Sequence, residues 1–285
     1  MTTKPTETPA SDPGSPVDFD VVVVGGGAAG LSAAVYTARY GLETLVLARG
    51  KSAIHQCAHL ENYLGFPGGV SPETFVSLGR AHVEHEGGTV IEDMVTGVER
   101  AEPGFRVEAG DGRDFVATSL LVASAYDGSY LDGISGIETA DPEGFLVGEH
   151  GRTAVDGLYA AGWIVDETAH QAIINAGHGA RVALALIRDD LCERYWEEIA
   201  DRYVDWVVRE GRYGGEGWDE HVAEWFDREM LPEGGDGEID SAIAEGALED
   251  LKAEFLGREI TEDERRRREK RGYDLITAHL ETTNP

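Results

Sequence analysis

Residues 18–30 read DFDVVVVGGGAAG, and they carry the clearest fold signal in the N-terminal part of the chain. The apolar run that ends at Val24 is typical of a strand buried on both faces of a parallel sheet. Gly25, Gly27 and Gly30 follow it, and the pattern then becomes helical and Ala-rich up to Tyr40. A glycine-rich turn between a buried strand and a helix predicts an α/β unit.

The spacing of the three glycines, G-x-G-x-x-G, has a physical reason. The first glycine allows the tight turn, the second lets the backbone approach a pyrophosphate, and the third lets helix and strand pack closely. The helix N-terminus, at Ala28 and Ala29, offers N–H groups and partial positive charge to an anion. We therefore predict a dinucleotide-binding Rossmann unit rather than a glycine turn with an empty pocket.

An acidic residue that binds the cofactor's ribose is expected about 20 residues further on, at the end of the second strand. Residues 44–48 form that predicted strand, and Arg49 follows it. Because no acid stands there, this position does not decide between FAD and NAD. Arg49 lies near the adenosine end of the cofactor or is simply an exposed arginine.

Hydrophobic periodicity predicts the rest of an α/β domain. A loop at 55–70 precedes the expected elements, which are a helix at 72–86, strands at 89–91, 95–100, 105–109, 113–116, 119–124 and 157–161, and a helix at 170–187. The three short strands between 95 and 116 predict an antiparallel meander beside the parallel sheet. We place this Rossmann-type domain at residues 18–188.

Both ends of the chain differ in composition from this domain. Residues 1–17 are rich in Thr, Pro and Ser, lack the apolar run of a signal peptide, and are predicted to form a disordered tail. From residue 189 onward, Trp and Tyr interleave with charged residues at helical spacing, which predicts an appended α-helical domain over 189–285. Its basic run RRRREK at 265–270 is interpreted as a solvated helix face, with docking to an acidic surface as the alternative.

The chain is strongly acidic, with 54 Asp and Glu against 24 Lys and Arg and a net charge of −30. Such a surface stays hydrated in molar salt, where charges are screened within about 3 Å. We expect a cytoplasmic, haloarchaeal protein, the alternative being a merely acidic mesophilic one. The charge argues against nucleic-acid binding, and no apolar run of ~18 residues predicts a membrane span.

Three segments together resemble one family, the thioredoxin-reductase-like flavoproteins of the pyridine nucleotide–disulphide oxidoreductases. The first is VVVVGGGAAGLSAAVYTARYGLETLVL at 21–47. The second is the loop at 55–70 with Gln56 and ENYLGFPG at 61–68, and the third is 153–186, where GLYAAG precedes a helix. The segments occur in the family's order over roughly residues 18–187.

The resemblance implies a site for FAD. The pyrophosphate would be held by Gly25, Gly27, Ala28, Ala29 and Gly30. The flavin, the ribityl chain and the adenine would be met by Gln56, Asn62, Val95, Gly162, Trp163, His170, Gln171 and Ala172. The N-terminus of the helix at 170–187 would stabilise the negative charge of a reduced flavin.

Three departures from the family bear on the chemistry. Trp163 stands where the family has an Asp that hydrogen-bonds the ribityl chain, and Asp166 is the nearest substitute. The redox C-x-x-C is absent, so thiol–disulphide exchange by the family's route is not expected. Only about thirty residues, 125–153, stand where the family has an NADPH domain, and a single βαβ unit already needs ~30. We therefore expect no nicotinamide domain.

Two residues are candidates for chemistry. Cys57 is a lone redox thiol near the flavin or a small loop residue. His170 donates to the flavin or relays a proton, or is a helix-terminal His without chemistry. Cys57 also alternates with His55, His59 and Glu61, but no second cluster completes a ligand set, so we predict no metal.

The sequence thus predicts an FAD-dependent oxidoreductase without its own nicotinamide domain. It would take electrons from a small-molecule or protein donor, NAD(P)H or a ferredoxin-like protein, and its C-terminal helices would cover the vacated space or form a homodimer. The alternative is a degenerate flavoprotein fold that acts as a binding or regulatory module, which Trp163 favours. A lone NAD-binding protein is disfavoured by the second motif near residue 160.

Overall fold

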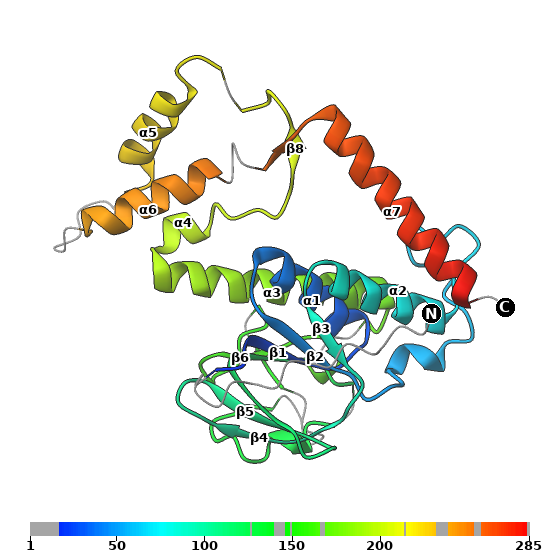
Figure 1. Cartoon of the computed structure of the whole chain (residues 1–285). Coiled ribbons are helices and arrows are strands. Elements are labelled where there is room, and N and C mark those ends of the chain that lie inside the picture. Colours follow the sequence, from blue (N-terminus) through cyan, green and yellow to red (C-terminus); the bar gives the residue numbers. More distant parts are fainter. Residues whose placement is uncertain are drawn as a thin grey trace, which may run out of the picture. The chain divides into compact units, whose positions relative to one another are not determined.

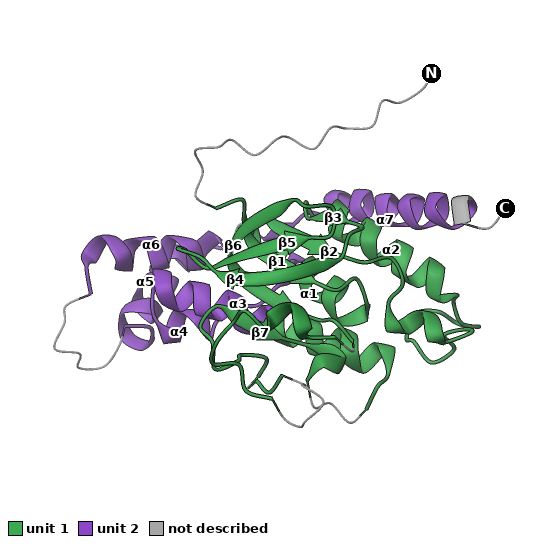
Figure 2. Ribbon diagram, turned by 90° about the horizontal axis from the view of Figure 1, so that it is seen from below, with its two compact units in different colours: residues 1–182 green, residues 183–285 purple. Residues whose placement is uncertain are grey.

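The computed structural model describes residues 17–125, 127–139, 146–148, 150–165, 169–213, 215–231, 239–253 and 258–283. The chain divides into two compact units, residues 1–182 and 183–285, which meet inside helix α3 (Ala172–Arg194) (Figure 2). The predicted tail at 1–17 lies, apart from Val17, outside the described residues. The predicted domain boundary between residues 188 and 189 falls in the same helix and stays a prediction.

A parallel sheet organises the first unit. Strand β1 (Phe19–Val24) pairs with β2 (Thr44–Leu47) on one side and with β6 (Asp114–Val122) on the other, both in parallel. Strand β3 (Thr89–Ile91) continues the sheet beyond β2, and β7 (Leu158–Ala160) lies beside β6. The order β3–β2–β1–β6–β7 is a Rossmann arrangement, so the predicted fold class is confirmed.

Strand β6 corrects one detail of the sequence interpretation. Separate strands were predicted at 113–116 and 119–124, but a single strand passes through both. Its first half pairs antiparallel with β5 (Phe105–Ala109), which in turn pairs with β4 (Val95–Arg100), and its second half pairs with β7. The reason is local, because no Gly or Pro separates the two segments and the chain has no cause to turn there.

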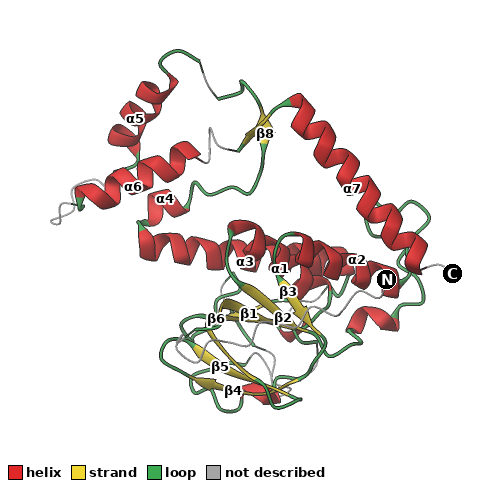
Figure 3. Ribbon diagram, in the orientation of Figure 1, coloured by secondary structure: helices red, strands yellow, loops and turns green. Residues whose placement is uncertain are grey.

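Helices and the meander cover opposite faces of the parallel strands. Figures 1 and 3 show α1 (Ala28–Tyr40), α2 (Pro72–His85) and the start of α3 on one side, and β4 and β5 on the other. Helix α1 ends at Gly41 in the left-handed region (φ 101°), and α2 begins at Ser71, whose Oγ accepts the Thr74 N–H at 3.1 Å. Both helix ends lie where the sequence signals predicted them.

The core of the first unit lies between the sheet and the meander. Phe105 is fully buried there, with the Arg100 guanidinium 4.6 Å from its ring centre. Fully buried aliphatic neighbours come from the parallel strands, namely Val22, Leu45, Leu120 and Leu158. This packing fixes the strands, so the loops at their carboxyl ends have a rigid base.

The second unit is mainly helical, as predicted, and has its own small core. Its elements are α4 (Glu197–Ala200), β8 (Val208–Arg209), α5 (Trp218–Glu229), α6 (Ser241–Lys252), β9 (Glu259–Ile260) and α7 (Glu262–Thr283). Ile199, Phe226 and Met230 are buried together, and the Trp196 indole donates to the Met230 carbonyl at 2.7 Å. Trp196 and Trp225 pack against this core, whereas Trp206 is 47% exposed and lies between α4 and α5, where the predicted helical spacing did not give a helix.

Helix α7 carries the basic run as a solvated face. Arg265 pairs with Glu262 at 2.8 Å, and Arg268 pairs with Glu264 at 2.7 Å, each within one turn of the same helix. Hydrogen bonds from Arg265 hold the pKa of the Glu262 carboxyl at about 2. Among the described residues, no helix has the length and apolarity that crossing a membrane requires.

Candidate functional site

The glycine-rich turn opens at the carboxyl end of β1. Gly25 has φ +118°, and a Cβ there would lie 2.6 Å from the carbonyl oxygen of Ala123. A Cβ on Gly30 would overlap the carbonyl oxygen of Gly25. Gly27 caps α1 in an extended conformation, and no side chain caps the helix end. No residue other than glycine therefore fits at these two positions of the turn. The turn also presents an uncapped helix N-terminus, which suits an anion.

The loop after β2 returns to this turn. A Cβ on Gly27 would lie 3.5 Å from the Cβ of Ser52, so the short helix η1 (Ala53–Gln56) begins beside the N-terminus of α1. Ser52 and His55 form a capping box in which the Ser52 N–H donates to His55 Nδ1 at 3.1 Å. Gln56, a residue predicted to face the flavin, is the last residue of η1.

The second motif meets the same turn from β7. Gly162 starts the short helix η3 (Gly162–Ile164), and a Cβ on it would lie 3.0 Å from the Cβ of Ala29. The Gly162 N–H donates to His178 Nδ1 at 3.2 Å, which ties η3 to α3. Gly179 of α3 packs directly against the Ala29 backbone. Two motifs more than 130 residues apart therefore converge on the first turn of α1.

The residues predicted at the flavin end form two pairs at the start of α3. Asn62 Nδ2 donates to Gln171 Oε1 at 2.8 Å, which links the loop at 55–70 to the residue before the helix. The Trp163 ring lies against the His170 ring, with centroids 4.5 Å apart. Ala172 begins α3, whose first turn holds no acidic residue. The structure therefore brings these predicted residues together around a helix N-terminus.

No printed contact links three further predicted residues to the glycine turn or to the start of α3, so their roles stay predictions. Val95 is in β4, paired with Ala109, with its side chain in the core. Arg49 is exposed, and its charge adds to the hydrogen bonds from Ser129 that lower the pKa of Asp127. Cys57 is an exposed free thiol just after η1.

Two expectations about polar groups remain open. Asp166, the predicted substitute for the acid at position 163, lies outside the described residues. In the described part of the chain, no group of three or more His, Cys, Asp or Glu side chains is placed to hold a metal ion. Neither finding changes the set of residues gathered at the turn.

Glu92, which was not among the predicted site residues, places an acid beside the residues that follow β2. A Cβ on Gly50 would lie 3.2 Å from Glu92 Oε1, so this carboxylate reaches the end of β2, where no acid was found. Arg80 holds Glu92 at 2.9 Å. Glu92 follows β3, and adjacent parallel strands end at the same edge, so the strand order would have pointed to it.

Two polar residues of α3 were also missed. Asn175 and His178 stand four and seven residues after Gln171, a spacing that places all three on one face of the helix. Asn175 is 8% exposed, and its Nδ2 donates to the Gln171 carbonyl at 3.1 Å. A polar line on a helix rich in Ala and Gly was the available signal.

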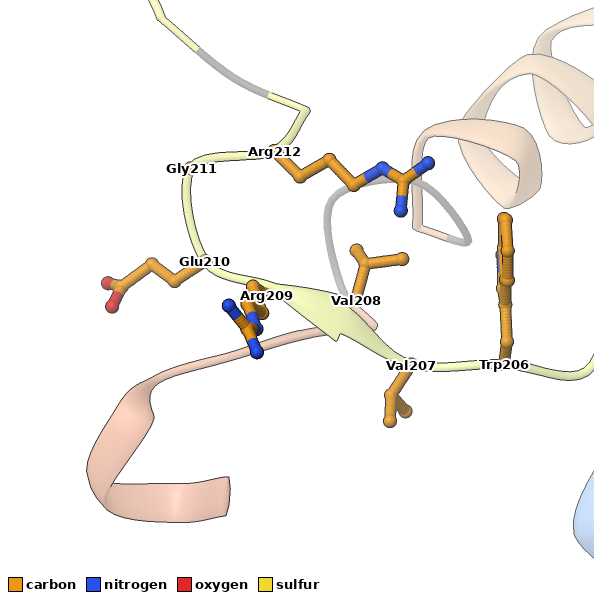
Figure 4. Close-up of a pocket in the computed structure, with 7 residues that line it drawn as sticks. All are labelled: Trp206, Val207, Val208, Arg209, Glu210, Gly211 and Arg212. Atoms are coloured by element: carbon orange, nitrogen blue, oxygen red, sulfur yellow. The ribbon is translucent and has the colours of Figure 1, made fainter. Parts of the chain in front are cut away.

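The second unit contains a hollow of about 440 Å³ on its surface, lined by residues 206–212 (Figure 4). The Arg212 guanidinium lies 5.3 Å from the centre of the Trp206 ring. None of the predicted cofactor-binding residues lines this hollow. The candidate site is therefore the convergence of motifs in the first unit.

Known proteins with similar sequences carry the same N-terminal domain. Residues 19–123 match the family described as pyridine nucleotide-disulphide oxidoreductase. These residues are a domain of that family. Thioredoxin reductase of Aquifex aeolicus is 34% identical over 108 residues, which are 37% of this chain and 33% of that protein. Thioredoxin reductase of Rickettsia felis is 25% identical over 181 residues, 59% of this chain and 56% of that protein. The chain thus matches only a third to somewhat over half of these relatives' length.

Solved structures show the same fold. A thioredoxin reductase from Gloeobacter violaceus aligns with a TM-score of 0.58 at 20% identity, covering 67% of this chain and 99% of that one. The enzyme from T. acidophilum aligns with a TM-score of 0.52 at 19% identity, covering 61% and 99%. The family and these neighbours are FAD-binding flavoproteins, so the predicted family resemblance and cofactor are confirmed at the level of the matched domain.

Proposed function

We propose that this chain is an FAD-dependent oxidoreductase related to thioredoxin reductase that works without a nicotinamide domain or redox dithiol of its own. The observation that carries the proposal is the convergence of both motifs on the first turn of α1. There Gly162 approaches Ala29, and the η1 loop approaches Gly27. A lone NAD-binding unit has no use for the second of these motifs.

The residues present fit FAD from end to end. The uncapped N-terminus of α1 at Gly27 suits the pyrophosphate, and Glu92 suits a ribose hydroxyl at the end of β2. The hydrogen-bonded pair of Asn62 and Gln171 suits the flavin end. Bound FAD would supply a flavin N5 that accepts and passes on hydride or electrons.

Two features of the chain would support that chemistry. The N-terminus of α3, with no acid in its first turn, places partial positive charge where a reduced flavin gains negative charge. His170, exposed and held against Trp163, would donate or relay a proton there. Cys57 would lie near the flavin edge as a lone thiol.

The electron donor would be NAD(P)H that diffuses in, or a ferredoxin-like protein. Between β6 and β7, the helix η2 (Ser129–Leu131) is the only helix among the described residues. An interval of this length is about that of one βαβ unit, whereas a nicotinamide domain needs several. The donor would therefore meet the flavin without a resident nicotinamide domain.

The net charge and the exposed apolar residues support proposals about the protein's environment and its oligomeric state. A net charge of −30 supports work in the cytoplasm of a halophile, where molar salt screens the acidic groups. The C-terminal helices would provide a homodimer contact, because α7 exposes Tyr273, Leu275 and Ile276.

A second candidate is a flavoprotein fold retained as a binding or regulatory module. The observation that favours it is Trp163, which stands where the family has a carboxylate and lies against His170. An indole offers no hydrogen-bond acceptor to a ribityl hydroxyl.

Reduction of the bound flavin separates the two candidates. The FAD-loaded protein, kept anaerobic in molar KCl, is mixed in turn with NADH, NADPH and reduced ferredoxin, and bleaching of the flavin band is followed. If the protein is an enzyme, the band of its bound flavin should bleach faster with at least one donor than the band of free FAD does under the same conditions. Bound flavin that no donor reduces faster than free FAD would favour the module.

A further inference from the structure

One buried oxygen of the candidate site has no hydrogen-bond partner. Asn175 is 8% exposed, and its Nδ2 is engaged with the Gln171 carbonyl at 3.1 Å. Its Oδ1 is closed to solvent and accepts no hydrogen bond from any residue that the structure describes. Buried side-chain oxygens are nearly always hydrogen-bonded, and leaving one unpaired is destabilising. An acceptor in this state points to a donor outside the described part of the chain, such as a ligand.

The position of this oxygen is where the two motifs meet. A Cβ on Gly162 would lie 3.6 Å from Asn175 Oδ1 and 3.0 Å from the Cβ of Ala29. The N–H of Gly162 is already donated to His178, so it does not satisfy the Asn175 oxygen. The unpaired acceptor therefore lies beside the path between the pyrophosphate end and the flavin end of the proposed FAD site.

The neighbouring residue explains why an acceptor is needed here. Trp163, directly after Gly162, occupies the position where a carboxylate would accept from the ribityl chain. Its indole has only a donor, and its ring lies against His170. Side chains from η3 thus offer the ribityl hydroxyls no acceptor at this position, whereas α3 has one in Asn175.

We propose that Asn175 is a cofactor-binding residue whose Oδ1 accepts a hydrogen bond from a hydroxyl of the ribityl chain, in place of the acid that Trp163 replaces. The inference rests on the proposed function, because it requires that FAD binds. Because the oxygen is closed to solvent, the proposal requires that neighbouring groups shift enough to expose it when FAD binds. The bond removes an unpaired acceptor that the cofactor-free chain carries.

The test compares Asn175→Ala and Asn175→Asp with Ile174→Ala, a truncation of the exposed neighbouring residue that removes no polar atom. FAD is titrated into each full-length variant in molar KCl, with tryptophan fluorescence as the readout, and thermal unfolding is recorded with and without FAD. Asn175→Ala should raise the Kd roughly 3- to 10-fold, the size of one hydrogen bond. Asn175→Asp should bind FAD at least as tightly as the wild type, because a carboxylate is the stronger acceptor. Ile174→Ala should stay within about threefold of the wild type, because it removes no acceptor.

Thermal unfolding without FAD separates binding from structure. Asn175→Ala removes the unpaired acceptor, but it also removes the hydrogen bond from Nδ2 to the Gln171 carbonyl. Because these two effects oppose each other, its melting temperature without FAD should stay close to that of the wild type, while its gain from FAD shrinks. The substitution Asn175→Ala should also be made in the Trp163→Asp variant, where the acid is restored. There it should weaken FAD binding less than in the wild type, so the effects of the two substitutions on the Kd should not be additive.

Three outcomes would contradict parts of the account. A wild type that binds FAD while Asn175→Ala binds it equally well would overturn this inference and leave the proposed function standing. If Asn175→Ala has a lower melting temperature without FAD and an unchanged Kd for FAD, Asn175 is a structural residue. A folded wild type that binds no FAD would overturn the proposed function and this inference with it.

Discussion

The two ends of the candidate cofactor site are built on different principles. At the glycine-rich turn the chain offers backbone groups, and the geometry leaves no room for a side chain on Gly25 or Gly30. At the second motif it offers side chains, and there Trp163 replaces the expected acid. Backbone recognition tolerates almost no change, whereas a side-chain contact can be taken over by a neighbouring element. Glu92 and Asn175 are the replacements this comparison suggests.

The largest expected effects come from the glycine turn. In Gly30→Ala the new methyl group overlaps the Gly25 carbonyl, so β1 and α1 must separate. We expect a loss of about 3 kcal/mol of unfolding free energy and no FAD binding. Denaturant unfolding in molar KCl and an FAD titration measure both quantities.

Gly27→Ala is the matched control for that variant. Gly27 has an extended backbone that alanine adopts, and the new Cβ would meet Ser52 at an ordinary 3.5 Å. The fold should survive, but the methyl group should block the close approach of the pyrophosphate and weaken FAD binding at least about tenfold. A Gly27→Ala protein that binds FAD as tightly as the wild type would place the pyrophosphate elsewhere.

The second effect tests the replaced acid directly. Trp163→Asp should tighten FAD binding by roughly tenfold, because a hydrogen bond to a carboxylate is worth about 1.5–3 kcal/mol. Trp163→Phe, which keeps an aromatic ring against His170, should leave the Kd nearly unchanged. Weaker binding in Trp163→Asp would mean that the indole itself contacts the cofactor.

A smaller effect is expected at the adenosine end. Glu92→Gln should weaken FAD binding about fivefold if this carboxylate binds the ribose, since the hydrogen bond loses its charged partner. Glu84→Gln, at an exposed position of α2, removes the same charge and should leave the Kd unchanged. Equal effects from both substitutions would reduce the role of Glu92 to general electrostatics. Isothermal titration with FAD gives both constants.

The smallest effect is expected at the bond between the two loops. Asn62→Ala removes the hydrogen bond to Gln171, which is exposed and therefore worth about 0.5–1 kcal/mol. Amide exchange in the loop at 55–70 should become faster, while exchange in β1 stays the same. Unchanged protection of the loop would show that its aromatic contacts, such as Tyr63 with Phe75 at 4.7 Å, hold it alone.

The sequence predicted the parts of the fold that depend on local patterns. A buried run followed by glycines and an Ala-rich helix defines β1, the turn and α1 without further information, and the capping signal at Ser71 marks the start of α2. The partner switch within β6 was not predictable from periodicity, because pairing depends on which strands the rest of the chain brings alongside.

The sequence predicted only part of the candidate site, because contacts between distant residues depend on the fold. Asn62 and Gln171 were found as single residues, but their mutual bond spans 109 positions and required the fold. Glu92 was missed because the acid was sought after β2 rather than at the shared edge of β2 and β3. The polar line of Gln171, Asn175 and His178 could have pointed to Asn175, but its unpaired oxygen is a property of packing that required the fold.

Whether this chain binds FAD can be read from the visible absorption spectrum of the protein purified in molar KCl. We expect a flavin band and close to one FAD released per chain on denaturation. A folded, colourless protein that stays colourless after FAD is added would contradict this expectation.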